Sequence, residues 1–169
     1  MIALALALLL QTATPPSSDW DDTPDDPAVF AMELEIIDAV SAVVDAFHAA
    51  ASRADGPAYF ALLAPGARFI GTDATERWTV QDFRAYAEPY FAAGRGWTYH
   101  PRNRVVRFNG DVAWFDEILD HDSYGVLRGS GVLVRTPAGW KIEQYVLSFA
   151  VPNDVADQVV ETIKGQPAP

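Results

Sequence analysis

Four β-prone runs separated by short turns fill the second half of the chain, and they constrain the fold more than any other feature. The runs are residues 97–108, 111–120, 125–136 and 140–149, and the turns fall at Asn109-Gly110, 121–124 and 137–139. Asn-Gly is the strongest short-range signal of a two-residue hairpin, while β-branched and aromatic residues favour strands. The pattern therefore predicts a meander of long antiparallel strands.

The first half of the chain has a helical period instead. Apolar residues recur at spacings of three and four between Ala31 and Arg53, which predicts an amphipathic helix with one buried face. The remaining expected elements are a short helix (57–63), a short strand (67–72), a helix from Val80 to Ala92 after the N-cap residue Thr79, and a peripheral helix from Asp154 to Lys164. This order predicts an α+β fold, with the helices on one face of a strongly curved antiparallel sheet.

The N-terminus predicts export. Residues 2–10 form an apolar run that is too short to span a bilayer and that fits the core of a signal peptide. We expect residues 1–13 to be a cleaved leader, 14–30 a disordered acidic linker rich in Pro and Ser, and 31–165 a single domain. The expected location is periplasmic or secreted, with no membrane attachment once the leader is removed. The alternative is a cytoplasmic protein with a loose apolar tail.

The composition excludes several classes of function. The chain of 169 residues has a net charge of −11, which disfavours nucleic acid and anionic membrane surfaces as partners. It contains no cysteine, which removes disulfides, thiol catalysis and thiolate metal sites. It lacks a glycine-rich phosphate loop and the motifs of serine hydrolases and zinc proteases, and its three histidines fall in separate elements. We therefore expect no cofactor and no metal ion.

Strand pleating places Asp116 and Arg128 on one face of the sheet. The Asn109-Gly110 turn sets Asp116 opposite Asn103, and closure of the 121–124 turn leaves Arg128 one diagonal step from Asp116. The other polar and aromatic residues of this face are Tyr99, Asn103, Trp114, Ser130, Gln144 and Ser148. The opposite face is expected to carry His100, Phe115, Glu117, Leu119, Leu127, Leu133, Tyr145 and Leu147. Because both faces contain large apolar residues, both need cover.

A resemblance to a known family rests on four segments. They are IDAVSAVVDAFHAAASRADGPAYFALLAPGARFIGTDATERW, DFRAYAEPYFAAG, GDVAWFDE and LRGSGVLVRTPAGWKIEQYVLSF. These segments are similar to the SnoaL-like domain of the nuclear transport factor 2-like superfamily, over about Glu33 to Pro152. The resemblance implies a cone-shaped fold whose cavity serves isomerases, dehydratases, epoxide hydrolases, polyketide cyclases and non-enzymatic binders. It also implies a homodimer, because one sheet face encloses the pocket and the other commonly packs against a second subunit.

We assign the Asp116 face to the pocket. In that position Asp116 acts as a general base, while Arg128 orients it or stabilises an oxyanion, and Tyr99 is an alternative helper. The expected ligand-binding residues are Trp78, Tyr99, Asn103, Trp114, Gln144 and Ser148. The structural alternative for the Asp116–Arg128 pair is an ion pair that fixes strand register, or an exposed pair of little energetic weight.

The expected function is the binding of a small apolar or aromatic molecule in the cone. The resemblance implies that catalytic members hold a His and an Asp, or an Asp, Arg and Asp set, in the cavity. The Asp116 face offers one carboxylate and one Arg with no His, which favours binding over catalysis. One alternative is a cofactor-independent lyase, isomerase or hydrolase that uses Asp116. Another is a dimerisation or protein-interaction module whose cone is filled by its own side chains.

Overall fold

The computed structural model describes residues 26–165, and the predicted leader and most of the predicted linker lie outside the described residues. The elements are α1 (Pro27–Ser52), α2 (Gly56–Ala61), β1 (Leu63–Ile70), β2 (Arg77–Thr79), α3 (Val80–Ala92), β3 (His100–Asn109), β4 (Val112–His121), β5 (Gly125–Thr136), β6 (Gly139–Phe149), the short 3-10 helix η1 (Asn153–Val155) and α4 (Ala156–Lys164). This order confirms the predicted α+β fold, although α1 already begins within the segment expected to be linker. None of these helices is both long and apolar enough to cross a membrane.

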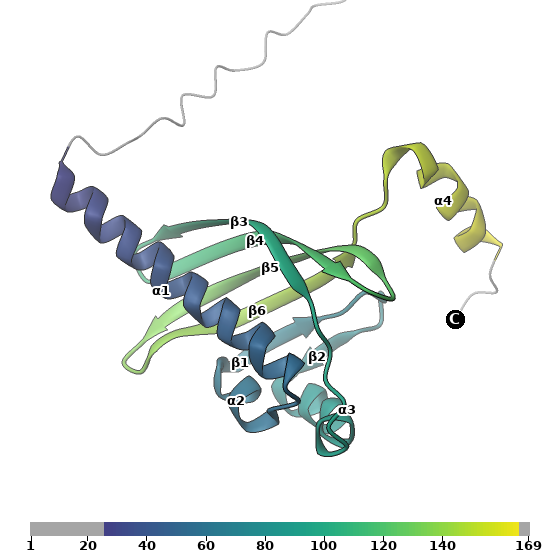
Figure 1. Cartoon of the computed structure of the whole chain (residues 1–169), viewed down its shortest axis with the longest axis horizontal. Coiled ribbons are helices and arrows are strands. Elements are labelled where there is room, and N and C mark those ends of the chain that lie inside the picture. The colour runs from purple at the N-terminus through teal and green to yellow at the C-terminus, as the bar shows by residue number, and fades with distance from the viewer. Residues whose placement is uncertain (1–25, 166–169) are drawn as a thin grey trace, which may run out of the picture.

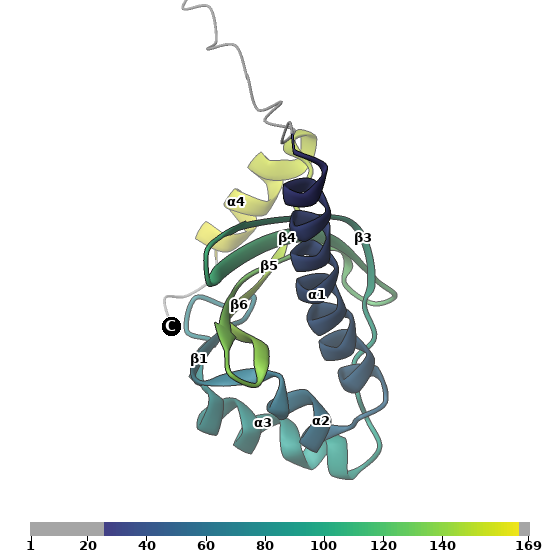
Figure 2. The same cartoon turned by 90° about the vertical axis from the view of Figure 1, so that its left-hand side faces the viewer.

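The six strands form one sheet in the order β2-β1-β6-β5-β4-β3. Strands β3 to β6 are the predicted antiparallel meander. Strand β1 pairs with β6 in parallel, so the sheet is mixed at this one position. Figure 2 shows the sheet curving strongly around α1, with α2 and α3 closing its lower edge.

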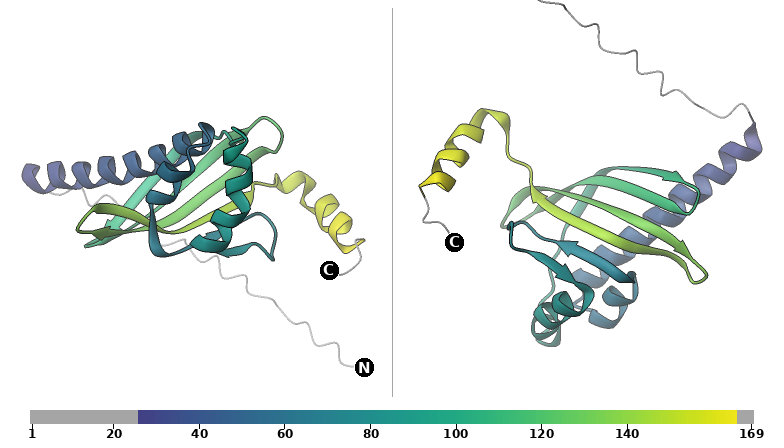
Figure 3. Two further views of the ribbon diagram at one scale, coloured as in Figure 1. Left: turned by 90° about the horizontal axis from the view of Figure 1, so that it is seen from below. Right: turned by 180° about the vertical axis from the view of Figure 1, so that it is seen from behind.

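The 26-residue helix α1 lies against the concave side of the sheet (Figure 1). Val40, Val44, Phe47 and Ala51 are buried and recur at spacings of three and four, which confirms the predicted apolar stripe. The Phe47 ring packs on Tyr145 of β6, with ring centroids 5.1 Å apart. The first turns of α1 extend past one end of the sheet, and α4 stands away from the opposite end (Figure 3).

Helix α3 occupies the predicted residues and has the predicted cap. The Thr79 hydroxyl accepts a hydrogen bond from the Asp82 backbone N–H at 3.1 Å, which satisfies one free donor of the first turn. Phe83 of α3 stacks on Phe69 of β1, with ring centroids 4.0 Å apart and planes at 10°. The sheet, α1, and the α2–α3 pair thus form the three walls of a cone.

The β4–β5 hairpin has the predicted face relationship. Asp116 pairs with Ser130 and Ile118 pairs with Arg128, so Asp116 and Arg128 share a face one diagonal step apart. Their side chains meet, with Arg128 Nη1 at 3.2 Å from Asp116 Oδ2. Pairing of β5 with β6 adds Ser148 to the same face.

The β3–β4 hairpin differs from its predicted register by two residues. Gly110 and Asp111 form the turn, since Asn109 pairs with Val112, and Gly110 has a positive φ of 59° that suits glycine. Asp116 consequently pairs with Val105. The expected pairing of Asp116 with Asn103 is wrong because the turn lies one residue later in the chain: residues 110 and 111 form it, where residues 109 and 110 were expected.

A β-bulge in β3 moves two further residues. The register shifts between Arg102 and Val105, where Asn103 adopts a positive φ of 54°. An extra residue in one strand exchanges the faces of everything beyond it. His100 therefore pairs with Asp120 on the convex side, and Tyr99 turns to the concave side, the reverse of the prediction for both.

The buried face of the sheet is the concave one. It carries Ala113, Phe115, Glu117, Leu119, Leu127, Leu133, Tyr145 and Leu147, which are all buried. The convex face carries Asp116 together with Val105 and Trp114, which are 45% and 46% exposed. Since α1, α2 and α3 lie on the concave side, the assignment of the Asp116 face to the pocket is wrong (Figure 2). The alternation of side chains along each strand sorted these residues correctly into two faces. The Asp116 face, which was expected to enclose the pocket, is the one that the helices do not cover.

Candidate functional site

A cavity of about 190 Å³ opens at the wide end of the cone, on the concave side of the sheet. Its lining residues are Phe69, Gly71, Thr72, Glu76, Trp78, Phe83, Tyr86, Trp97, Tyr99, Tyr124 and Leu147. They come from the β1–β2 hairpin, α3, the segment before β3, the β4–β5 turn and β6. The cavity is therefore built by segments that only the complete fold brings together.

The aromatic rings of the lining hold one another in place. Trp78 packs on Tyr86 with ring centroids 5.0 Å apart, and both rings also pack against Phe83. On the opposite side Tyr99 contacts the imidazole of His121, with centroids 5.3 Å apart. Interlocked aromatic rings have few rotamers and lose little entropy when they contact a ligand, so the cavity wall is largely preformed.

A short acidic loop forms the rim. The Gly71 N–H donates to the Glu76 carbonyl at 2.9 Å, and the Glu76 carboxylate accepts from the Asp73 N–H at 3.2 Å. Hydrogen bonds from the Thr75 hydroxyl and backbone lower the pKa of Asp73 below its usual value. Glu76 lines the cavity while Asp73 is exposed, so the rim presents negative charge at the entrance.

A polar cluster lies at the inner end of the cone, among apolar side chains. Glu117 of β4 is fully buried, and its Oε1 accepts a hydrogen bond from His48 Nε2 of α1 at 2.6 Å. Its Oε2 accepts from Arg104 Nε of β3 at 2.8 Å. Arg104 also bonds to Asp45 and to the Ser41 carbonyl of α1, at 2.8 and 3.1 Å. The carboxylate thus ties β4 to β3 and to α1.

Three tyrosines lie near this cluster. Tyr59 and Tyr145 are buried, and neither hydroxyl has a hydrogen-bond partner among the described residues. Burial raises the pKa of Tyr59 well above its usual value, and burial and the charge of Glu117 do the same for Tyr145. Burial raises the pKa of Tyr99 to about 12. All three hydroxyls therefore stay protonated at physiological pH and are available as hydrogen-bond donors.

Two of the predicted site residues line the cavity. Trp78 and Tyr99 both face into it, although Tyr99 reaches it through the bulge that the prediction lacked. Their contact with a ligand stays a prediction.

The other predicted residues lie elsewhere. Asp116 and Arg128 form an ion pair on the convex face, with side chains 49% and 51% exposed. Trp114, Gln144 and Ser148 share that face, and Asn103 is exposed at the bulge. Their expected place in the pocket is corrected, because the helices that enclose the cavity lie on the opposite face. An exposed ion pair of this kind contributes about 0.2–1 kcal/mol to the stability of the fold. This matches the alternative interpretation of the Asp116–Arg128 pair as an exposed pair of little energetic weight.

The polar cluster was not predicted, although two signals pointed to it. Glu117 alternates with Phe115 and Leu119 on what is otherwise an apolar face, so strict pleating buries a carboxylate. His48 follows Val44 by four residues on the buried stripe of α1. A buried charge needs a partner, so a lone Glu on one apolar face and a His on the other indicate a pair.

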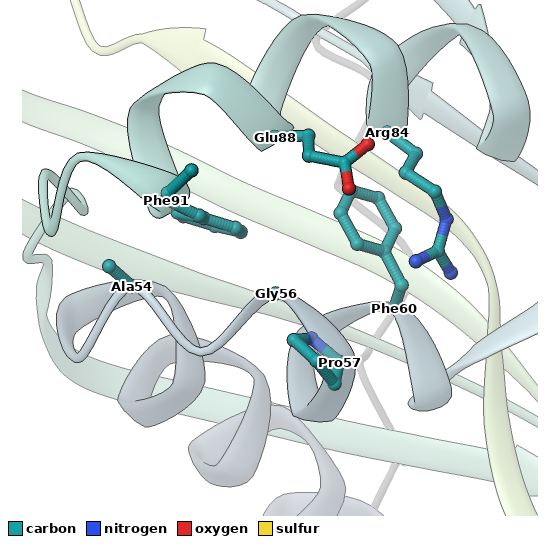
Figure 4. Close-up of a pocket in the computed structure, with 8 residues that line it drawn as sticks. Ala54, Gly56, Pro57, Phe60, Arg84, Glu88 and Phe91 are labelled. Carbon is teal, nitrogen blue, oxygen red and sulfur yellow. The ribbon is translucent and has the colours of Figure 1, made fainter.

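A second hollow of about 270 Å³ lies outside the cone, between α2 and α3 (Figure 4). Figure 4 shows the Arg84 side chain beside the Phe60 ring, and its guanidinium carbon is 4.3 Å from the ring centroid. Arg84 and Glu88 are both exposed, so water already satisfies them. The hollow therefore lacks the desolvated polar groups that give a site selectivity. Within residues 26–165, no group of three or more His, Asp or Glu side chains is arranged to hold a metal ion.

The sequence profile of the SnoaL-like domain matches residues 40–152, which is more than half of the chain. The chain belongs to the SnoaL-like domain family. A comparison with curated proteins gave no match.

Solved structures share the fold of this SnoaL-like domain at low identity. A proposed dehydratase of the NTF2-like family from Streptomyces avermitilis has a TM-score of 0.62 at 16% identity, covering 71% of this chain and 99% of that chain. A domain of unknown function with a cystatin-like fold from Nostoc punctiforme has a TM-score of 0.64 at 17% identity, covering 79% and 88%. An NTF2-like protein of unknown function from Pseudomonas putida has a TM-score of 0.60 at 16% identity, covering 76% and 92%. This likeness establishes the fold alone.

Glu117 and Asp116 are neighbours in the chain with carboxylates on opposite faces of the sheet, so they provide a matched test of how much the polar cluster stabilises the fold. Replacing Glu117 by Gln leaves Arg104 largely buried without its main counter-charge, so we expect the free energy of unfolding to fall by about 3–5 kcal/mol. Asp116→Asn removes an exposed pair and should cost at most about 1 kcal/mol. Urea unfolding followed by circular dichroism measures both. Equal small effects would show that Glu117 does not hold the cone together.

Proposed function

We propose that this SnoaL-like domain binds a small aromatic molecule in the cavity at the wide end of its cone. The observation that carries the proposal is the lining, in which seven of eleven residues are aromatic. Such a wall matches the π-face and the apolar area of a planar ligand, and pockets of this type are common small-molecule sites. The polar groups at the rim, Thr72 and Glu76, supply orientation.

The volume of the cavity limits the size of the ligand. An apolar cavity of about 150 Å³ engineered into another protein binds benzene. At about 190 Å³, this cavity has room for a single ring with a small substituent. The cone deeper in is filled by the chain's own rings, since Phe47 stacks on Tyr59 with centroids 4.1 Å apart. The chain's own aromatic rings thus fill the inner part of the cone and leave the wide end open.

The negative charge of the protein further limits the chemical class of the ligand. The chain has a net charge of −11, and Glu76 stands at the rim of the cavity. Negative potential around a low-dielectric entrance lowers the local concentration of anions. These features support a neutral or cationic aromatic molecule over a carboxylate or phosphate.

Acid–base catalysis by Asp116 finds less support. A general base must lie within hydrogen-bond reach of its bound substrate. Asp116 and its partner Arg128 are half exposed on the face that the helices do not cover. Tyr99, the alternative helper, faces the cavity on the opposite side of the sheet. Binding of a ligand is therefore better supported than catalysis by Asp116.

Toluene provides a simple probe of the cavity. Titration of the ¹⁵N-labelled protein should shift the backbone amides of Gly71 and Thr72 and leave those of Gly56 and Glu88 beside the outer hollow unchanged. Trp78→Ala removes one wall, and the lost aromatic contact and apolar area should weaken binding by roughly 10-fold. Trp114→Ala, on the convex face, is the matched control and should bind like the wild type. Shifts confined to the outer hollow, or no saturable shifts at all, would contradict the proposed function.

We further propose a homodimer formed through the convex face. Val105, Val112 and Trp114 are each more than 40% exposed there, and a contiguous apolar patch of this kind favours association. Sedimentation equilibrium should show a dimer for the wild type and a monomer for Trp114→Arg. A wild-type monomer at high concentration would contradict this proposal without affecting the cavity.

Export is proposed on the apolar run of residues 2–10. N-terminal sequencing of the protein from its own host tests it, with loss of the first 13 residues expected. A chain that keeps Met1 and stays in the cytoplasm would contradict it.

A further inference from the structure

The hydroxyl of Tyr145 is an unexplained polar group behind the wall of the cavity. The residue is 1% exposed, and its hydroxyl has no hydrogen-bond partner among the described residues. Buried hydroxyls in folded proteins are almost always paired with the chain, with water or with a ligand. The Tyr59 hydroxyl shares this feature, but the Tyr145 hydroxyl is the one that lies beside the Glu117 carboxylate.

Strand register shows which way the hydroxyl points. Tyr145 pairs with Gly131 of β5, and the adjacent row toward the wide end of the cone is Glu117, Gly129 and Leu147. A Cβ built on Gly129 would stand 2.6 Å from the Tyr145 hydroxyl. The ring thus leans by one row toward the wide end, and its hydroxyl lies over Gly129, where any side chain would displace it.

The same position adjoins both the buried carboxylate and the cavity. A Cβ on Gly129 would also stand 3.1 Å from Glu117 Oε1. Leu147, the cross-strand neighbour of Gly129, lines the cavity, and so does Phe69, which stacks on the Tyr145 ring with centroids 5.6 Å apart. A donor, the Tyr145 hydroxyl, and an acceptor, the Glu117 carboxylate, therefore lie directly behind the cavity wall to which Leu147 and Phe69 belong.

This pair of groups selects one functional group. Glu117 Oε1 already accepts from His48, and its second lone pair can take another donor. An atom between the two residues must accept from Tyr145 and donate to Glu117. A hydroxyl does both, whereas a carbonyl or an ether oxygen only accepts. A ligand carboxylate would be repelled by Glu117.

We propose that the ligand is a phenol whose hydroxyl accepts a hydrogen bond from Tyr145 and donates one to Glu117. The inference rests on the proposed function, because it assumes that an aromatic ring occupies the cavity. The ring lies against Phe69 and Tyr99, and the hydroxyl points inward past Leu147, toward the Tyr145 and Glu117 oxygens. A neutral phenol also suits a cavity with an acidic rim in a protein of net charge −11.

Three probes of similar shape separate the two hydrogen bonds. Phenol can accept and donate, anisole can only accept, and toluene can do neither. Binding of each to the full-length protein is measured by NMR titration. We expect phenol to bind roughly 10-fold more tightly than toluene, with anisole no better than toluene, because its oxygen faces a carboxylate that it cannot bond.

Removal of the hydroxyl tests the role of Tyr145 directly. Tyr145→Phe should weaken phenol binding by roughly 10-fold and leave toluene binding unchanged. Tyr59→Phe is the matched control, because it deletes an equally buried, unpaired hydroxyl whose ring packs against Phe47, Phe91 and Trp97 behind the cavity lining. It should leave both affinities unchanged. Both variants remove a group that has no partner within the described chain, so both should fold.

The outcomes separate this inference from the proposed function. If phenol and toluene both bind and Tyr145→Phe leaves their ratio unchanged, the assignment of a phenol is overturned and aromatic binding stands. If neither probe binds the wild type, the proposed function and this inference both fail. A tenfold loss confined to phenol in Tyr145→Phe supports the assignment.

Discussion

The arrangement of the cone depends on the buried carboxylate of Glu117. A charge without solvent is tolerated only when its oxygens are paired, and its partners come from two other elements, His48 of α1 and Arg104 of β3. An apolar stripe alone would allow α1 to pack at several positions along the sheet. The hydrogen bonds of the cluster form at only one of these positions, because they are directional. Arg104 extends the restraint to Asp45 and Ser41 of α1. The cluster therefore fixes α1 over the concave face and so sets the shape of the space enclosed.

Three polar groups of the core occupy positions where an apolar side chain is expected. Glu117 and His48 occupy positions that the apolar pattern reserves for core residues, and Tyr145 has a buried hydroxyl that no described residue satisfies. Such inconsistencies gather at functional sites. Here Glu117 and Tyr145 lie behind the wall of an aromatic cavity, in the strand row that also holds Leu147 of its lining and in the row beside it. The convex face shows the opposite character, with an exposed ion pair and exposed apolar residues that suit association more than chemistry.

Local signals predicted most of the fold. The helical period of α1, the Thr79 cap of α3 and the turn residues between strands act over a few residues, and they gave the elements nearly in place. Alternation also sorted Asp116 and Glu117 onto opposite faces. Local signals do not show which face of the sheet encloses the cavity, because both faces carry large apolar residues. That face is determined by tertiary structure, through the side on which the helices pack. The bulge at Asn103, which brings Tyr99 into the cavity, has no comparable signal beyond the tolerance of Asn for positive φ.

A crystal structure of the full-length protein grown with phenol would show directly where the ligand binds. It would show whether the aromatic cavity on the concave side is the ligand site and whether the polar groups behind its wall bind a hydroxyl. We expect density for one ring between Trp78 and Tyr99, with its oxygen in hydrogen-bond reach of both Tyr145 and Glu117. A ring bound instead beside Trp114 on the convex face or in the hollow between α2 and α3, or a cavity that holds only water, would contradict it.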